Sequence, residues 1–74
     1  MSDTIFAGRW TYVPARTVQV GDVFGSPDRW EDAPERVTDV RPGRDKTVRI
    51  FTTRYLDHPY IEHMDNPVRI GIED

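Results

Sequence analysis

The 74-residue sequence contains no cysteine. This absence excludes a disulfide scaffold, a cysteine-based zinc site and an enzyme with a thiol nucleophile. The sequence also lacks any apolar run close to the roughly 20 residues that a membrane-spanning helix needs. It has no basic N-terminal region followed by a hydrophobic segment. We therefore expect a cytoplasmic protein that does not enter a membrane.

Leucine and alanine, the strongest helix formers, are scarce. The chain has one leucine, Leu56, and three alanines, against eight valines and five isoleucines, whose β-branched side chains favour a pleated surface. Six prolines leave no proline-free stretch longer than the sixteen residues 43–58, and proline inside a helix costs about 3 kcal/mol. The composition therefore predicts an all-β fold without long helices.

The shortness of the chain limits both its core and its domain count. A protein of this size buries only about 60% of the surface that its unfolded chain exposes, so the core is thin. We expect a single small β-barrel domain over residues 1–74, with residues 1–8 flexible.

Hydrophobic alternation between turn residues predicts six short strands. They are expected at residues 9–13, 17–24, 35–41, 46–55, 60–64 and 68–72. Gly21 and Asp22 supply a sharp bend within the second strand, in which Val18 and Val20 share a face. Val37 and Val40 are three residues apart, so the third strand needs a bulge to place both on one face. Turns about every eight to twelve residues are typical of a small barrel or sandwich.

The strand at residues 46–55 has the clearest alternation. Val48, Ile50 and Thr52 are expected on one face, and Arg49, Phe51, Thr53 and Tyr55 on the other. In the closing strand, Val68, Ile70 and Ile72 are expected to face inward. The turn-rich segment 25–34 contains Trp30, which is expected to fold back over one end of the core.

Several of these segments together resemble a known class of domain. The bend Val-Gln-Val-Gly-Asp-Val-Phe at residues 18–24, the strand Arg-Val-Thr-Asp-Val-Arg at 36–41 and the strand Thr-Val-Arg-Ile-Phe-Thr at 47–52 are similar to small SH3-like barrels. KOW-type and Tudor-type modules belong to this class, as do compact barrels of actinobacteria and their phages. The resemblance covers residues 17–72 and implies five to six short antiparallel strands with an adaptor or regulatory role, including modulation of a host.

The bend also occurs in the self-splicing Hint fold. That fold needs a cysteine or serine as its first residue and a Thr-x-x-His block, and neither is present in this sequence.

Charge is unevenly distributed along the chain. Residues 36–56 contain six basic and two acidic residues, a net charge of +4, whereas residues 1–35 carry −3 and residues 57–74 carry −4. The overall charge of −3 argues against a nucleic-acid binder that uses its whole surface. The distribution is explained either by acidic strands pairing with basic strands or by a localised basic contact face.

The first candidate binding surface is the outward face of the strand at 46–55. Aromatic rings alternating with cations suit single-stranded nucleic acid, and arginine and aromatic residues are also enriched in protein interfaces. The same aromatic residues could instead belong to the core. The candidate residues are Arg36, Arg41, Arg49, Phe51, Arg54 and Tyr55, with Arg44 and Lys46 nearby.

A second candidate is an aromatic groove. It would contain Trp10, Tyr12, Trp30 and Tyr60, flanked by acidic residues, and would suit a basic or proline-rich peptide. The alternative is that these rings fill the core.

Few residues or motifs of the sequence indicate metal binding or catalysis. His58 and His63 are the only histidines, with Asp57, Glu62 and Asp65 nearby, but five residues apart on a strand they point to opposite faces. No Gly-x-Ser-x-Gly motif and no glycine-rich phosphate loop is present. We expect neither a metal nor a cofactor, and no enzymatic activity.

The sequence thus predicts an SH3-like barrel, monomeric or a small homo-oligomer, that binds a protein partner. The first alternative is a nucleic-acid module that uses the basic central strands. The second is a structural subunit of a phage particle or another assembly, which self-associates through an exposed edge strand.

Overall fold

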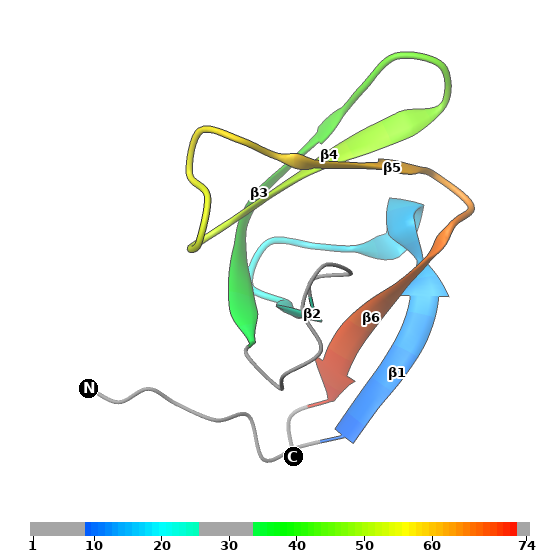
Figure 1. Cartoon of the computed structure of the whole chain (residues 1–74). Coiled ribbons are helices and arrows are strands. Elements are labelled where there is room, and N and C mark those ends of the chain that lie inside the picture. The colour runs from blue at the N-terminus through cyan, green and yellow to red at the C-terminus, as the bar shows by residue number, and fades with distance from the viewer. Residues whose placement is uncertain (1–8, 26–33, 73–74) are drawn as a thin grey trace.

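The computed structural model describes residues 9–25 and 34–72, which form six strands and one short 3-10 helix (Figure 1). The predictions for residues 1–8 and for Trp30 concern residues outside these two ranges. The strands are β1 (Arg9–Pro14), β2 (Val23–Gly25), β3 (Glu35–Pro42), β4 (Thr47–Thr52), β5 (Tyr60–His63) and β6 (Pro67–Ile72), and the 3-10 helix is η1 (Ala15–Thr17). The predicted all-β fold is confirmed for the described residues. None of them belongs to a helix long and apolar enough to cross a membrane.

The six strands form one antiparallel sheet in the order β1-β6-β2-β3-β4-β5. In Figure 1, β3, β4 and β5 cross the upper part of the molecule, and β1 and β6 run side by side in the lower part. Among the described strands, β1 and β5 are the two ends of the sheet and no pairing joins them. Backbone hydrogen bonds from Ala15 and Arg16 to the carbonyls of Asn66 and Met64, at 2.8 and 3.0 Å, instead join η1 to the turn between β5 and β6.

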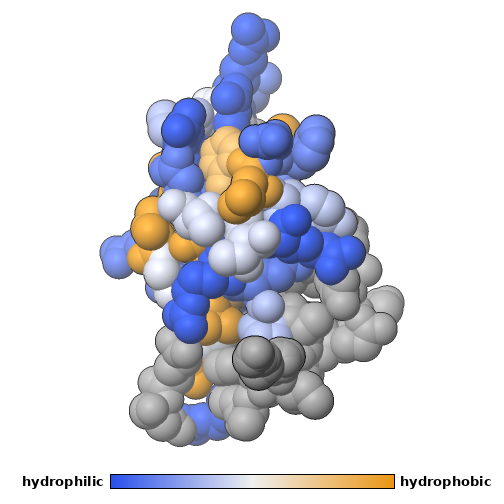
Figure 2. Space-filling model, turned by 90° about the vertical axis from the view of Figure 1, so that its left-hand side faces the viewer, coloured by the Kyte–Doolittle hydropathy of each residue, from blue (hydrophilic) through white to orange (hydrophobic). Residues whose placement is uncertain are grey.

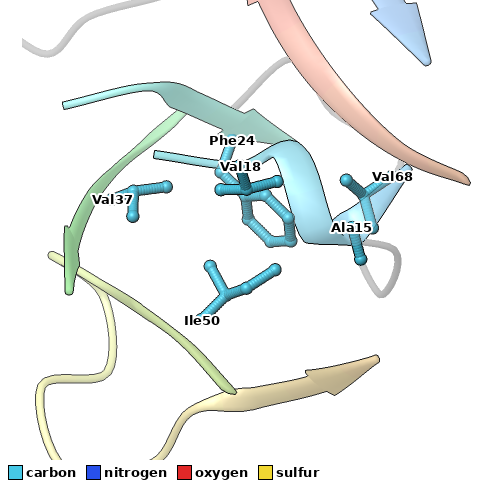
Figure 3. Close-up of a cluster of buried hydrophobic side chains, with 6 residues drawn as sticks. All are labelled: Ala15, Val18, Phe24, Val37, Ile50 and Val68. Carbon is cyan, nitrogen blue, oxygen red and sulfur yellow. The ribbon is translucent and has the colours of Figure 1, made fainter. Parts of the chain in front are cut away.

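The core lies inside the curve of this sheet (Figure 3). Its cluster of buried hydrophobic side chains comprises Ala15, Val18, Phe24, Val37, Ile50 and Val68. Phe24 and Ile50 are fully buried, and the partly buried Val13, Val40, Val48, Tyr60 and Ile70 pack around the cluster. Ile72 was expected to face inward but is 39% exposed, since it lies at the last position of the closing strand.

The strand predicted at residues 17–24 is wrong in its first half. Thr17 closes η1 by donating its hydroxyl to the Pro14 carbonyl at 2.7 Å, and the segment that follows is irregular up to β2. Val20 does not share a buried face with Val18 but is 63% exposed. The predicted bend is present at Gly21, whose φ of 96° favours glycine.

The bulge predicted in the third strand is confirmed. The register of β3 against β4 shifts between Val37 and Asp39. This shift allows Val37 to be 1% exposed and Val40 also to pack against the core. The hairpin between these two strands ends in a turn in which Asp45 and Lys46 have φ angles of 54° and 62°. Positive φ at two successive turn residues is the geometry that matches the twist of a hairpin.

Candidate functional site

Strand β4 has one buried and one outward face, as its alternation predicted. Ile50 and Thr52 are fully buried, Arg49 is exposed and Phe51 is half-buried. Residues directly opposite each other in an antiparallel pair share a face. Asp39 of β3 lies opposite Phe51, and Arg41 of β3 lies opposite Arg49. On the other side, Ile61 of β5 lies opposite Arg49.

The outward side of β3 and β4 carries a hollow of about 300 Å³ that is open to solvent. Its lining residues come from β3, β4 and the β4–β5 loop: Thr38, Asp39, Arg41, Phe51, Leu56 and Asp57. Figure 2 views the side of the molecule from which this loop projects, and hydrophobic side chains lie there among hydrophilic ones. We call the hollow, together with Arg49 and Ile61, the outer surface.

Arg41 connects the charged and aromatic parts of the outer surface. Its guanidinium lies 5.5 Å from the centre of the Phe51 ring, and its Nε donates to the Asp39 carboxylate at 2.7 Å. The Arg41 side chain nevertheless remains 65% exposed. An exposed cation over a ring contributes about 0.5–1 kcal/mol, so this pair is held in place while staying accessible to a partner.

The strand predicted at residues 46–55 is too long, and this changes the position of two candidate residues. Strand β4 ends at Thr52, so Tyr55 leaves the face that carries Arg49 and Phe51. Thr53, the first residue after β4, forms two hydrogen bonds with the backbone of Arg36. Its N–H donates to the Arg36 carbonyl at 2.9 Å, and its hydroxyl accepts a hydrogen bond from the Arg36 N–H at 3.2 Å. The loop that follows can then turn away from the sheet.

Tyr55 and Arg54 form a second pairing of a ring with a guanidinium in the β4–β5 loop. The guanidinium of Arg54 lies 5.0 Å from the centre of the Tyr55 ring. A side-chain hydrogen bond with Tyr55 raises the pKa of Arg54, and the Glu35 carboxylate adds a weaker contribution in the same direction. The Tyr55 ring also meets the Tyr60 ring edge-on at 6.1 Å between centroids. These contacts attach the loop to the sheet beside the hollow.

Beneath that loop lies a buried carboxylate that the sequence did not reveal. Glu35 is 5% exposed and accepts hydrogen bonds from the Thr52 hydroxyl at 2.7 Å and from the Tyr60 hydroxyl at 3.0 and 3.2 Å. Tyr60 also packs against Phe24, with 5.1 Å between ring centroids. Because buried carboxylates are costly unless hydrogen-bonded, these two hydroxyls make Glu35 compatible with the core.

Arg36, another cation of the predicted binding surface, has a structural contact. Its guanidinium donates to the Gly21 carbonyl at 2.7 Å and so supports the bend before β2. Arg36 is therefore engaged in the fold, whereas Arg41 and Arg49 lie on the outer surface.

The members of the predicted aromatic groove do not all come together. Trp10 lies on the outward side of β1, where the Arg69 guanidinium is 4.6 Å from the centre of its indole ring, and Tyr12 is opposite Arg69 and 68% exposed. Tyr60 instead faces the core, where its hydroxyl bonds to Glu35. Trp30 lies outside the described residues.

The two histidines are both exposed and make no common site. His63 accepts a hydrogen bond from the Asp65 backbone at 3.1 Å through its Nδ1, and His58 lies in the β4–β5 loop. Within residues 9–25 and 34–72, no three histidine or carboxylate side chains are close enough to hold a metal ion.

Comparisons with known proteins give no further guidance to the function: no protein-family model, curated protein or solved structure matches this chain.

Proposed function

We propose that this protein is a small non-enzymatic adaptor with an SH3-like barrel fold, and that it binds a protein partner through the outer surface. The backbone hydrogen bonds between η1 and the β5–β6 turn support the barrel, since they draw the two ends of the sheet together. A regulatory or host-modulating role, and an origin in actinobacteria or their phages, are part of the same proposal.

The observation that carries the proposal is the exposure of apolar side chains beside arginine and an aromatic ring. Leu56 and Ile61 are 66% and 63% exposed, and Leu56 lines the same hollow as Arg41 and Phe51. Burying a leucine or isoleucine side chain contributes about 1.5–3 kcal/mol. Aromatic residues and arginine are also the side chains most enriched in protein interfaces. The outer surface therefore has the composition that a protein partner requires.

Capture from the native host tests the proposal. The tagged protein is compared with Leu56→Gln, which removes one apolar contact from the outer surface without adding charge. Val20→Gln is the matched control, because Val20 is 63% exposed and does not line the hollow. Lysates are treated with nuclease, captured proteins are identified by mass spectrometry, and the affinity of the purified partner is measured.

We expect a protein that is retained by the wild type and by Val20→Gln, and whose affinity falls about tenfold with Leu56→Gln, which corresponds to about 1.4 kcal/mol. The proposal fails if both variants bind equally, or if capture depends on nucleic acid.

Two alternatives have their own supporting observations. The exposed Arg41, Arg44, Lys46 and Arg49 favour a nucleic-acid module, whose affinity must fall steeply with salt. The unpaired outer edges of β1 and β5 in the described sheet favour a self-assembling subunit. Sedimentation that shows only monomer at high protein concentration would contradict self-assembly.

A further inference from the structure

The outer surface contains two arginines that face each other across the β3–β4 hairpin. Arg41 and Arg49 are direct partners in the strand register, and both are exposed. Like charges directly opposite on neighbouring strands destabilise a sheet. Asp39 offsets the charge of Arg41 through its ion pair, but the Arg49 side chain has no hydrogen bond or ion pair with any residue that the structure describes. Among the described residues, the arrangement therefore leaves the positive charge of Arg49 without a partner in the middle of the row.

The tip of the same hairpin adds two further cations. Arg44 and Lys46 are exposed, and neither side chain is paired within the described part of the chain. Asp45 between them is the one acidic residue of the turn. In Figure 1 the hairpin extends beyond the rest of the sheet, so these charges are accessible from more than one side. An anionic partner would reduce the mutual repulsion of the four cations.

Apolar side chains accompany these charges. Ile61 continues the row formed by Arg41 and Arg49 on the next strand and is 63% exposed. With strands about 4.8 Å apart, the row spans about 10 Å, which is the reach of two or three residues of an extended chain. Phe51 and Leu56 lie on the hollow beside it. A partner that fits this row must present negative charge and apolar side chains together.

We infer that the outer surface binds an extended segment of a partner protein that presents acidic and apolar side chains together on one face, at every second position. A carboxylate of this segment lies between Arg41 and Arg49, and the apolar side chains contact Ile61, Phe51 and Leu56. Arginine suits this role because its guanidinium matches a carboxylate with two parallel hydrogen bonds. The inference rests on the proposed function and adds the chemical class of the partner.

Two observations favour an acidic peptide over nucleic acid. Arg41 and Arg54 already cover one face each of the Phe51 and Tyr55 rings, which reduces the ring area on which bases would stack. Asp39 and Asp57 line the hollow, and their carboxylates would repel a continuous phosphate backbone. A peptide with separate carboxylates does not need the ring faces for stacking, and it does not bring a continuous line of negative charge close to Asp39 and Asp57.

Binding of short synthetic peptides tests the inference directly. The probes are a peptide in which glutamate and leucine take turns at every second position with serine between them, the same peptide with glutamine in place of glutamate, and single-stranded oligodeoxythymidylate. Backbone amide shifts of the full-length protein locate the contact, and a titration gives the affinity. Arg49→Glu is compared with Arg9→Glu, an equal change of charge at an exposed position on β1, which pairs with β6 in the described sheet and lies away from β3 and β4.

We expect the glutamate peptide to shift the amides around Arg41, Arg49 and Ile61, and its affinity to fall at least about tenfold with Arg49→Glu but not with Arg9→Glu. Equal binding of the glutamine peptide, an absence of binding, or binding of the oligonucleotide alone would each overturn the inference. The proposed function would survive that failure if a captured protein still loses affinity with Leu56→Gln, so the two experiments separate the two claims.

Discussion

The sheet carries an arginine over an aromatic ring on its outward side in two places, with different consequences. On β1 and β6, Arg69 lies 4.6 Å from the Trp10 ring centre, and both side chains are half-buried and adjoin the buried Gly25. On β3 and β4, Arg41 lies 5.5 Å from the Phe51 ring centre and remains 65% exposed. The first pair is enclosed by the fold and the second is open to a partner.

The difference comes from the neighbours of each pair. Trp10 and Arg69 are close to a third strand, β2, whose Gly25 has no side chain to separate them from the sheet. Arg41 and Phe51 have the open hollow beside them. A cation paired with a ring across two strands therefore packs against the fold where the neighbouring strand has a glycine beside it, and remains an open surface where a hollow lies beside it.

Gly25→Ala should produce the largest effect, because it breaks the enclosed pair. A Cβ at this position would overlap Nε of Arg69, which can move aside, and would lie 2.9 Å from the Trp10 ring, so the ring must shift and the pair is disrupted. We expect a loss of about 1–3 kcal/mol in the free energy of unfolding, measured by urea denaturation. An unchanged stability of Gly25→Ala would show that the enclosed pair is not needed.

Thr52→Val tests how much the buried Thr52 hydroxyl stabilises the strand that carries Phe51 of the open pair. The change keeps the shape of the side chain but removes the hydroxyl that donates to Glu35, so that Tyr60 is left as the donor to this buried carboxylate among the described residues. We expect a loss of about 1–3 kcal/mol in the free energy of unfolding. Thr53→Val is a control of the same chemistry on the exposed side of the strand end. Equal effects of the two changes would contradict a special role for the buried hydroxyl.

Alternation along the chain was sufficient to predict much of this arrangement. Val48, Ile50 and Thr52 followed the period of a strand, and the spacing of Val37 and Val40 required the observed bulge. The buried Glu35 could not be found in this way. Its donors are 17 and 25 residues away in sequence, and a charged residue at a strand end ordinarily indicates exposure.

The errors have similar long-range causes. Residues 17–22 have the alternation of a strand. The backbone N–H groups of Ala15 and Arg16, however, donate to carbonyls of the β5–β6 turn, and the chain forms a 3-10 helix up to Thr17 instead of a strand. Tyr55 continues the alternation of β4 in sequence, yet the chain leaves the strand at Thr52 and packs the ring against Tyr60. Local spacing defines the faces of a strand, whereas its ends depend on partners that are distant in sequence.

Arg41→Ala should have the smallest effect on stability and a large effect on binding. This result would show that the open pair serves binding, whereas the enclosed pair serves stability. An exposed ion pair and an exposed guanidinium over a ring contribute little, so we expect the free energy of unfolding to change by less than about 1 kcal/mol. The affinity for the glutamate peptide should fall about tenfold, since half of the arginine row is removed. Arg16→Ala is the control, because Arg16 also forms an exposed ion pair, with Asp65, but lies on η1. If Arg41→Ala instead destabilises the protein as much as Gly25→Ala does, the pair on β3 and β4 is structural, and the outer surface must bind its partner without it.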